Sequence, residues 1–311
     1  METIQGISKL SISKPTAVTI GTFDGVHVGH KRILERLINN AKNADMQAAV
    51  LTFFPHPRMV LQKDADIKLL NTLEEKERIL AQMGLDYLIV HPFTQEFSRL
   101  TAIEFVRDML VNKLKAKSIV IGYDHRFGRN RNASIDDLKN FGKTYDFIVD
   151  EISAQEVDDV SVSSTKIRKA LLSGDVETAR RYLGYTYMLS GIVVKGKGLG
   201  KTLGFPTANL RIPQSYKLVP QNGVYIVRCL VNGEKATGIM NIGTNPTVAG
   251  KGQHLEVHLF NISQDLYDTE VQVQFLKKIR EEQKFASLQD LTEQLQKDKA
   301  VAMEYLNNEN N

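Results

Sequence analysis

The spacing of apolar residues changes once along this chain of 311 residues, near Gly184, and the change limits the folds open to it. Between residue 17 and Gly184, short apolar runs alternate with amphipathic stretches of helical period, a pattern that predicts a parallel α/β sheet. Beyond Gly184, strand-like runs follow one another and predict an antiparallel barrel, with a packed helix from Ser287 to Leu306. We therefore expect an α/β protein of two domains, residues 1–184 and 185–311.

Each predicted strand is short and bounded by turn residues. The ranges are 17–20, 48–54, 86–90, 118–122 and 146–152 in the first half, and 187–194, 223–231, 236–242, 254–260 and 270–275 in the second. Capping-box spacing marks helix starts at Thr72 with Glu75, Thr101 with Glu104 and, more weakly, Ser134 with Asp137. Ligands of open parallel sheets lie beyond the carboxyl ends of the strands, so we expect a site near the turns at Gly21 and Gly122.

Composition excludes several classes of protein. Apolar residues make up 42% of the chain and charged residues 24%, which are values of a folded globular protein. The net charge of +4 is mildly basic without a Lys/Arg block, so we expect small anionic substrates and no nucleic acid. Cys229 is the only cysteine, which excludes an internal disulfide and a multi-cysteine metal site. No apolar run approaches about 18 residues and no leader pattern is present, so we expect a cytoplasmic protein without a membrane partner.

The segment Gly21-Thr-Phe-Asp-Gly-Val-His-Val-Gly-His30 joins the first predicted strand to a predicted helix over 31–41. Glycines allow a sharp turn and a close approach to a ligand, and His27 and His30 fall at or just before the first helical turn. Free backbone N–H groups and the helix dipole make that position an anion site suited to phosphates. A structural alternative is that the histidines only cap the helix.

Two further polar segments follow strands in the first half. Ser163-Ser-Thr-Lys-Ile-Arg168 puts cations in a first helical turn, where they oppose the helix dipole unless a polyanion binds there. Its alternative is a capped, solvated basic helix end. The loop from Gly122 to Arg129, which contains Asp124 and His125, is either part of a site or simply a polar loop.

In the second half, the glycine-rich segment Lys195-Gly-Lys-Gly-Leu-Gly-Lys-Thr202 is similar to two phosphate-binding motifs but matches neither of them. A Walker A motif needs glycine where Lys195 stands, and a dinucleotide motif needs glycine where Lys201 stands. The residues that follow are extended and turn-rich, whereas both motifs open a helix. Taken alone, the segment is a flexible hairpin loop.

Pro206-Thr-Ala-Asn209 and Glu256 supply oxygen ligands and a carboxylate. Thr207 and Asn209 share one side of an extended chain and present neutral oxygens, which suit magnesium held chiefly by nucleotide phosphates. Glu256 faces away from the side shared by Leu255, Val257 and Leu259. Alone, such a carboxylate is most often exposed to solvent.

The histidine pair and the distal Ser/Arg segment resemble the nucleotidylyltransferase superfamily. More closely, Gly21 to His30, Phe54-Pro-His-Pro-Arg58, the loop from Gly122 to Gly128 and Val162 to Arg168 resemble, in order, the FMN adenylyltransferase module of bifunctional bacterial FAD synthetases. The resemblance implies a Rossmann-like domain in which the phosphate of FMN attacks the α-phosphorus of ATP. It implies ATP binding by Gly21, Thr22, Phe23, Asp24, His27, His30, Ser164 and Arg168, and flavin binding by Arg58 and Asp124. His125 stands where the family commonly has Phe.

The second half resembles the riboflavin kinase module of the same enzymes. Gly198 to Asn209, Asn222-Gly-Val-Tyr225, Met240 to Thr247 and Leu255-Glu-Val-His258 match in order. The resemblance implies that Glu256 takes the proton from the riboflavin 5′-hydroxyl and that Thr207 and Asn209 coordinate Mg²⁺ with ATP. The implied phosphate loop contains Gly196, Gly198, Gly200 and Lys201.

Together the two resemblances predict a bifunctional enzyme that makes FMN from riboflavin and FAD from FMN, as a monomer or weak homo-oligomer. One alternative is a nucleotidylyltransferase with another phosphorylated acceptor, because the histidine pair is shared across that superfamily. Another is a flavin- or RNA-binding regulator built on a degenerate enzyme fold. The intact site residues argue against this regulator.

Overall fold

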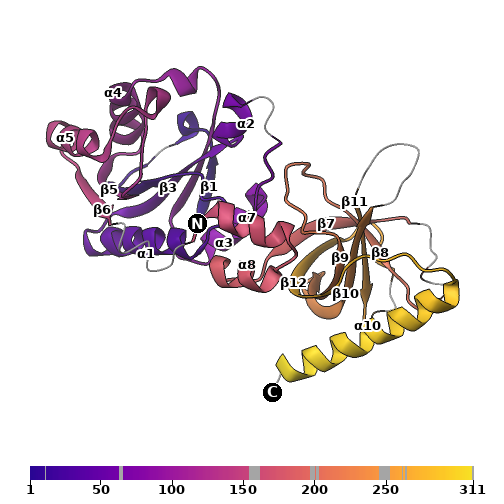
Figure 1. Cartoon of the computed structure of the whole chain (residues 1–311). Coiled ribbons are helices and arrows are strands. Elements are labelled where there is room, and N and C mark those ends of the chain that lie inside the picture. Colours follow the sequence, from indigo (N-terminus) through magenta and orange to yellow (C-terminus); the bar gives the residue numbers. More distant parts are fainter. Residues whose placement is uncertain are drawn as a thin grey trace. The chain divides into compact units, whose positions relative to one another are not determined.

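A computed structural model describes residues 1–10, 12–62, 66–153, 162–196, 200, 203–244, 253–260, 262 and 265–309. The chain divides into two compact units, residues 1–164 and 165–311. Figure 1 shows an α/β arrangement in the first and a barrel in the second. The predicted fold class is confirmed for both halves.

The first unit is built on a six-stranded sheet with the order β1-β4-β3-β2-β5-β6. Every pair of neighbours is parallel. The strands are β1 (Glu2–Gln5), β2 (Thr16–Ile20), β3 (Gln47–Phe54), β4 (Tyr87–Pro92), β5 (Ala116–Gly122) and β6 (Ile148–Ile152). The chain moves outward from β2 through β3 to β4 and then returns to the other side of β2 at β5. The carboxyl ends of β2 and β5 therefore flank the topological switch point, where ligands bind in such sheets.

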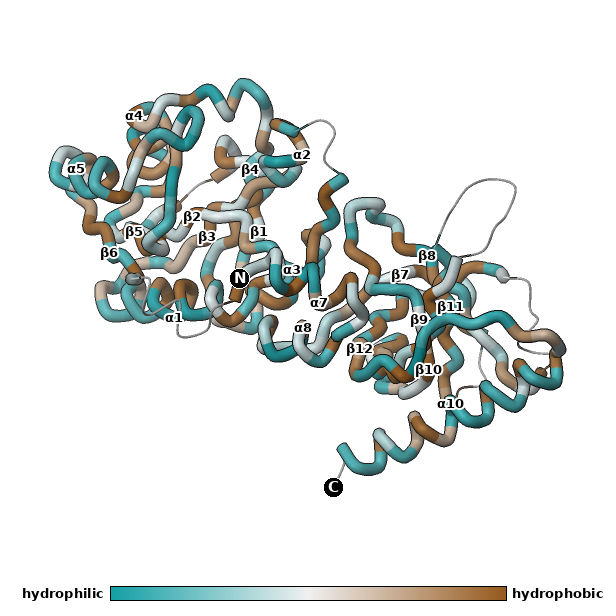
Figure 2. The backbone as a smooth tube through the Cα atoms, viewed as in Figure 1, coloured by the Kyte–Doolittle hydropathy of each residue, from teal (hydrophilic) through white to brown (hydrophobic). Residues whose placement is uncertain are grey.

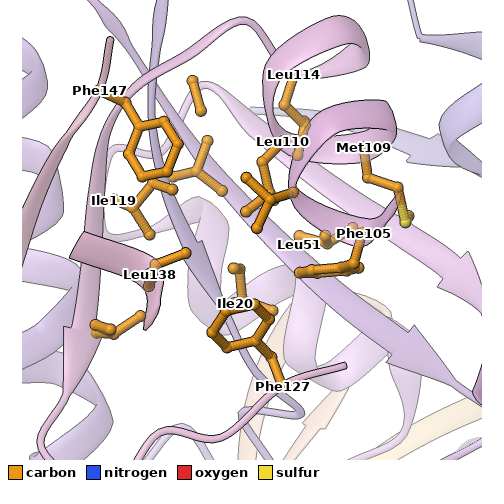
Figure 3. Packing of buried hydrophobic residues seen from close by; sticks show 14 of the residues in the cluster. Ile20, Leu51, Phe105, Met109, Leu110, Leu114, Ile119, Phe127, Leu138 and Phe147 are labelled. Atoms are coloured by element: carbon orange, nitrogen blue, oxygen red, sulfur yellow. The ribbon is translucent and has the colours of Figure 1, made fainter. Parts of the chain in front are cut away.

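Helices cover both faces of this sheet. The helical elements of the unit are η1 (Ile7–Lys9), α1 (Val28–Asn43), α2 (Pro57–Leu61), α3 (Leu73–Ala81), η2 (Phe97–Arg99), α4 (Ala102–Glu104), the π-helix η3 (Phe105–Lys113), η4 (Arg129–Arg131) and α5 (Ile135–Tyr145). One core packs η3 and α5 against alternate residues of β2, β3 and β5 (Figure 3). The other packs α1 and α3 against the opposite faces of β2, β3 and β4. This burial on two sides explains the continuous apolar runs of the strands.

The second unit contains a closed antiparallel barrel with the order β10-β11-β8-β7-β12-β9. Its strands are β7 (Met188–Val194), β8 (Ala208–Arg211), β9 (Gly223–Val231), β10 (Glu234–Thr244), β11 (Gln253–Leu259) and β12 (Glu270–Arg280). Buried and half-buried residues alternate along β7 and β11, as a barrel with a filled interior requires. The short strands β1 and β8 were not predicted, because four residues are too few to establish a period.

In the described part of the second unit, the barrel is accompanied by α7 (Ser164–Leu172), whose first residue closes the first unit, α8 (Val176–Leu183) and α10 (Leu288–Glu309). Ser287 and Asp290 form the predicted reciprocal cap at the start of α10, with both bonds at 3.1 Å. Hydrophobic residues interrupt the mostly hydrophilic α10 at intervals (Figure 2), and Ala302 and Leu306 pack into a core with Ile226 and Leu276. Helix α8 lies against β12.

Capping boxes are present at all three predicted helix starts of the first unit. Among the described residues, no helix combines the length and the apolar character needed to cross a bilayer.

Candidate functional site

The turn that follows β2 has an unusual backbone. Gly25 adopts φ +88°, and Phe23 and Val26 also have positive φ values of 45° and 37°. A positive φ is rare for a β-branched residue such as Val26, and such conformations cluster at functional sites where surrounding contacts hold them. Contacts from other residues must therefore stabilise the conformation of this turn.

That support comes from three side chains in other parts of the first unit and from Asp24 of the turn itself. The carbonyl oxygen of Thr22 accepts hydrogen bonds from Lys76 Nζ at 2.7 Å and from Thr52 Oγ1 at 3.3 Å. Asp24 is buried, and its Oδ1 accepts from the backbone N–H of Leu70 at 2.9 Å. Ser164 Oγ donates to the carbonyl oxygen of Asp24 at 2.9 Å. The Ser164 hydroxyl thus braces the turn, which links the two segments that the sequence assigned to one phosphate site.

The two histidines meet at the start of α1. His27 is its N-cap, and His27 Nδ1 accepts from the backbone N–H of His30. The two rings are stacked, with centroids 3.7 Å apart and planes inclined by 16°. The edge of Phe23 contacts the His30 ring at a centroid distance of 5.1 Å. The predicted placement of both imidazoles at the first helical turn is confirmed.

Burial keeps this pair uncharged. It lowers the pKa of His27 to about 4. The pKa of His30 lies well below its usual value because of burial, with further lowering by His27 and Lys76. Since His27 Nδ1 accepts a hydrogen bond, the neutral ring carries its proton on Nε2 and can donate from that atom. The pair therefore presents neutral donors at a helix N-terminus, an arrangement suited to anionic oxygens.

The loop after β5 borders the same edge of the sheet. Tyr123 and Asp124 are exposed, and Asp124 Oδ1 lies 3.7 Å from the point where a Cβ on Gly122 would stand. Ile33 of α1 lies equally near that point, so Asp124 is close to the helix that begins with the histidines. His125 is stacked on Phe127 at 6.2 Å, and burial lowers its pKa to about 4.

A row of aromatic rings extends along the carboxyl ends of β3, β4 and β5. Phe97 is its centre, with ring centroids 4.8 to 6.2 Å from those of four neighbours: Phe53, His91, Phe93 and Phe105. Phe127 continues the row from Phe105. Phe53, Phe93 and Phe97 are half-buried. The sequence did not reveal this row, because its members come from separate segments.

Two other predicted site residues lie on the helices α2 and α7. Arg58 is exposed on the short helix α2, where its backbone N–H donates to His56 Nδ1. Arg168 lies on α7, four residues and about one turn beyond Ser164. Their assignment to phosphate and flavin stays a prediction.

The second unit brings the predicted kinase residues together. A Cβ on Gly196 would stand 2.0 Å from Asn209 Nδ2, and one on Gly200 would stand 3.2 Å from Thr207 Oγ1. The two glycines therefore allow the chain to pass directly over the Asn209 and Thr207 side chains. The other two predicted loop residues, Gly198 and Lys201, lie outside the described residues.

Glu256 lies opposite Asn209 in the register of β11 and β8, and opposite Asn241 of β10. It occupies the half-buried face of β11, as predicted, and His254 Nε2 lies 2.9 Å from its Oε1. On the same face, His258 Nδ1 donates to the carbonyl oxygen of Pro206 at 2.8 Å, immediately before Thr207. A carboxylate and two neutral oxygen ligands thus share one surface of the barrel.

Within the part of the chain that the structure describes, no three His, Cys, Asp or Glu side chains form a metal cage. Thr207 and Asn209 are neutral, and the backbone of Gly196 and Gly200 passes close to their side chains. These donors fit an Mg²⁺ ion that arrives with phosphate ligands, not one that the protein holds alone.

Comparisons with known proteins match both units. The FAD synthetase family model matches residues 9–166 and the riboflavin kinase model matches residues 183–306. The bifunctional riboflavin kinase/FMN adenylyltransferase of Escherichia coli K12 is 40% identical over 308 residues, covering 98% of each chain. The enzyme of the same description from Bacillus subtilis is 38% identical and covers 94% of this chain and 93% of its own.

The chain belongs to the bifunctional riboflavin kinase/FMN adenylyltransferase family. The family resemblance stated from the motifs is confirmed over nearly the whole chain. The second half also decides against a nucleotidylyltransferase with another acceptor, because that alternative gives no role to a riboflavin kinase unit.

A solved structure shares the fold. A crystal structure described as a macrolide-efflux protein from Streptococcus pneumoniae aligns with a TM-score of 0.89 at 32% identity, covering 97% of this chain and 98% of that one. The activity named for that protein differs from those of the riboflavin kinase/FMN adenylyltransferases. The comparison therefore supports the fold of this chain and not its activity.

The sequence did not point to several residues that surround the candidate sites. They are Thr52 and Lys76 around the turn, Phe53, Phe93 and Phe97 in the aromatic row, and His254 and His258 on β11. Only Lys76 left a signal in the sequence, because a lysine there interrupts the apolar stripe of a predicted helix.

Proposed function

We propose that the barrel unit transfers the γ-phosphoryl group of ATP to riboflavin and that the α/β unit transfers an adenylyl group from a second ATP to FMN. The observation that supports this best is the presence of a separate phosphate cradle in each unit. One is the stacked histidine pair at the N-terminus of α1, and the other is formed where Gly196 and Gly200 cross Asn209 and Thr207.

In adenylyl transfer, a phosphate oxygen of FMN bonds to the α-phosphorus of ATP while the bond to the bridging oxygen breaks and pyrophosphate leaves. The attacking oxygen is already ionised, so no general base is needed. His27 and His30 donate to the ATP phosphates and stabilise the charge that develops on the leaving group. Ser164 and Arg168 hold the β- and γ-phosphates, and Gly21, Thr22, Phe23 and Asp24 shape the turn around the nucleotide.

In the kinase reaction, the riboflavin 5′-oxygen bonds to the γ-phosphorus as the bond to the β,γ-bridging oxygen breaks and ADP leaves. Glu256 accepts the hydroxyl proton. Thr207 and Asn209 hold the Mg²⁺ that accompanies ATP, and the loop with Gly196, Gly198, Gly200 and Lys201 covers the phosphates. When bound, the metal neutralises phosphate charge, and alignment supplies most of the remaining acceleration.

We assign the binding of FMN in the adenylyl transfer step to the aromatic row and to the loop that follows β5. Half-buried Phe53, Phe93 and Phe97 offer apolar ring surface to a planar isoalloxazine at the sheet edge that carries the histidines. Asp124 and Arg58 supply polar contacts to the ribityl phosphate part. In this proposal the FMN phosphate points toward α1.

We place the boundary between the two catalytic domains at residues 184 and 185. The family models support it, since one ends at 166 and the other begins at 183. We further propose that the enzyme works in the cytoplasm as a monomer or weak homo-oligomer, with ATP, riboflavin, FMN and FAD as its ligands.

Single substitutions test the assignment of the two sites. His30→Ala should abolish FAD formation from FMN and leave FMN formation from riboflavin unchanged, and Glu256→Ala should have the reverse effect. Each reaction is followed by chromatographic separation of riboflavin, FMN and FAD after incubation with ATP and Mg²⁺. Loss of both activities in either folded variant would contradict the proposal of two separate sites.

A further inference from the structure

Lys76 stands where the packing of α3 calls for an apolar residue. It follows Leu73 by three positions and precedes Leu80 by four, so it shares their side of the helix. Only 6% of its surface is exposed, and Leu80 on the same side is fully buried. Lysine is rarely buried unless it is paired or has a function, so its presence in this stripe needs a reason.

The Lys76 ammonium group lies against the turn after β2. Nζ donates to the carbonyl oxygen of Thr22 at 2.7 Å, and this oxygen also accepts from Thr52. Thr22 directly precedes Phe23, the first of the three residues with positive φ. Lys76 therefore fixes the turn at the point where its strained backbone begins.

The charge of Lys76 acts on the site as well. Burial lowers its pKa to about 8, and nearby Asp24 opposes that shift. The same ammonium group contributes to the lowered pKa of His30, after burial and His27. Asp24 and His30 therefore lie within electrostatic reach of the Lys76 ammonium group. A polyphosphate bound at the histidines would add the negative charge that favours the ammonium form.

An apolar residue would pack in this stripe without the cost of burying a cation. A hydrogen-bond donor alone would satisfy the Thr22 carbonyl. The feature that neither replacement supplies is a positive charge next to the neutral His30 imidazole.

We propose that Lys76 is a positioning residue of the adenylyl transfer site, which holds the Thr22 carbonyl and places a buried positive charge beside His30 for the polyphosphate of ATP and the departing pyrophosphate. The inference rests on the proposed function of the first unit. It assigns to α3 a part in phosphate binding that the motifs of the turn and of α7 do not include.

Two substitutions separate charge from hydrogen bonding. Lys76→Gln keeps a donor for Thr22 but removes the charge, whereas Lys76→Arg keeps both. We expect Lys76→Gln to lower kcat/KM for FAD formation from FMN by about tenfold or more and to weaken inhibition by added pyrophosphate by a similar factor. Lys76→Arg should retain most of the wild-type kcat/KM and most of the inhibition by pyrophosphate. The kinase activity of the second unit, measured on the same samples, is the internal control for enzyme concentration, and the circular dichroism spectrum of each variant reports the folding of the whole chain.

A third readout follows His30 directly. In Lys76→Gln, the pKa of His30 measured by NMR should rise, because a neighbouring cation has been removed, and Lys76→Arg should leave it unchanged. If Lys76 had a purely structural role, Lys76→Gln would lower the free energy of unfolding but would leave the pKa of His30 unchanged.

The inference is overturned if Lys76→Gln makes FAD at the wild-type rate with unchanged pyrophosphate inhibition, or if Lys76→Arg is as impaired as Lys76→Gln. Should Lys76→Gln unfold the first unit, Lys76→Met takes its place, because Met fits the apolar stripe and also lacks the charge. Wild-type FAD formation by folded Lys76→Met would overturn the inference. If the wild-type enzyme forms no FAD from FMN, the proposed function itself fails, a different outcome from either of these.

Discussion

The rings of His27 and His30 are stacked with centroids 3.7 Å apart at the first turn of α1. This contact is favourable only while the pair is not doubly protonated, because two imidazolium rings at that distance would repel each other. The stacked geometry is therefore stable only while at least one of the two rings is neutral.

The stability of the first unit should consequently depend on pH through His27. Its pKa is about 4 in the folded protein and near 6.5 when unfolded. The unfolded state therefore takes up the proton first as the pH falls. The contribution of His27 to the free energy of unfolding is therefore fully present above pH 6.5. It is lost between pH 6.5 and pH 4, by about 3 kcal/mol in total for a shift of this size, and does not change further below pH 4.

His27→Asn tests this linkage, because Asn retains the N-cap but does not titrate. Denaturant unfolding at pH 7.5 should give similar free energies for wild type and variant, whereas at pH 4.5 the variant should have lost less. Equal losses in the two proteins would show that His27 does not carry the pH dependence.

Gly196→Ala should disable the kinase. The added Cβ would stand 2.0 Å from Asn209 Nδ2, so the amide must move from its position beside the loop. We expect KM for MgATP in FMN formation to rise about tenfold or more, with FAD formation from supplied FMN unchanged as the control. A variant with wild-type kinetics would remove Asn209 from the ATP site.

His258 should position Thr207 through its bond to Pro206. The ring also lies between Phe205 and Phe260, at 5.3 and 5.6 Å. His258→Asn places an amide nitrogen near the Nδ1 position and should keep most kinase activity, whereas His258→Phe fills the space without a donor and should lose about tenfold. Steady-state FMN formation distinguishes the two, and equal activity would mean that the hydrogen bond has no such role.

Asp298 should anchor α10 to the barrel. It is buried and accepts from Arg280 Nε and Nη2, with the shortest contact at 2.8 Å. Asp298→Ala removes the carboxylate partner of Arg280 and should lower the free energy of unfolding of the barrel unit by about 3 kcal/mol. Glu281→Ala removes a mostly exposed partner of Lys278 and should cost less than about 1 kcal/mol, which makes it the matched control. Equal effects would contradict the anchoring role.

The sequence predicted those helices and strands that are long enough for their pattern of apolar residues to repeat. The capping boxes at Thr72, Thr101 and Ser134 were predicted from local spacing, since both partners lie within one turn. The histidine pair was predicted for the same reason. By contrast, β8 has only four residues, and its place beside β11 depends on barrel closure.

Residues brought to the sites by tertiary packing could not be predicted. Lys76 reaches Thr22 across 54 positions, and the aromatic row collects rings from three strand ends. Nothing in the local pattern shows that His258 faces Pro206. Such contacts depend on the order of strands, which apolar periodicity does not encode.

The most direct test of two separate ATP sites is a crystal structure of the whole chain grown with Mg²⁺ and a non-hydrolysable ATP analogue. We predict triphosphate density in two places, one against His27 and His30 and the other against Thr207 and Asn209. Density at only one of these positions, or at neither, would contradict the account.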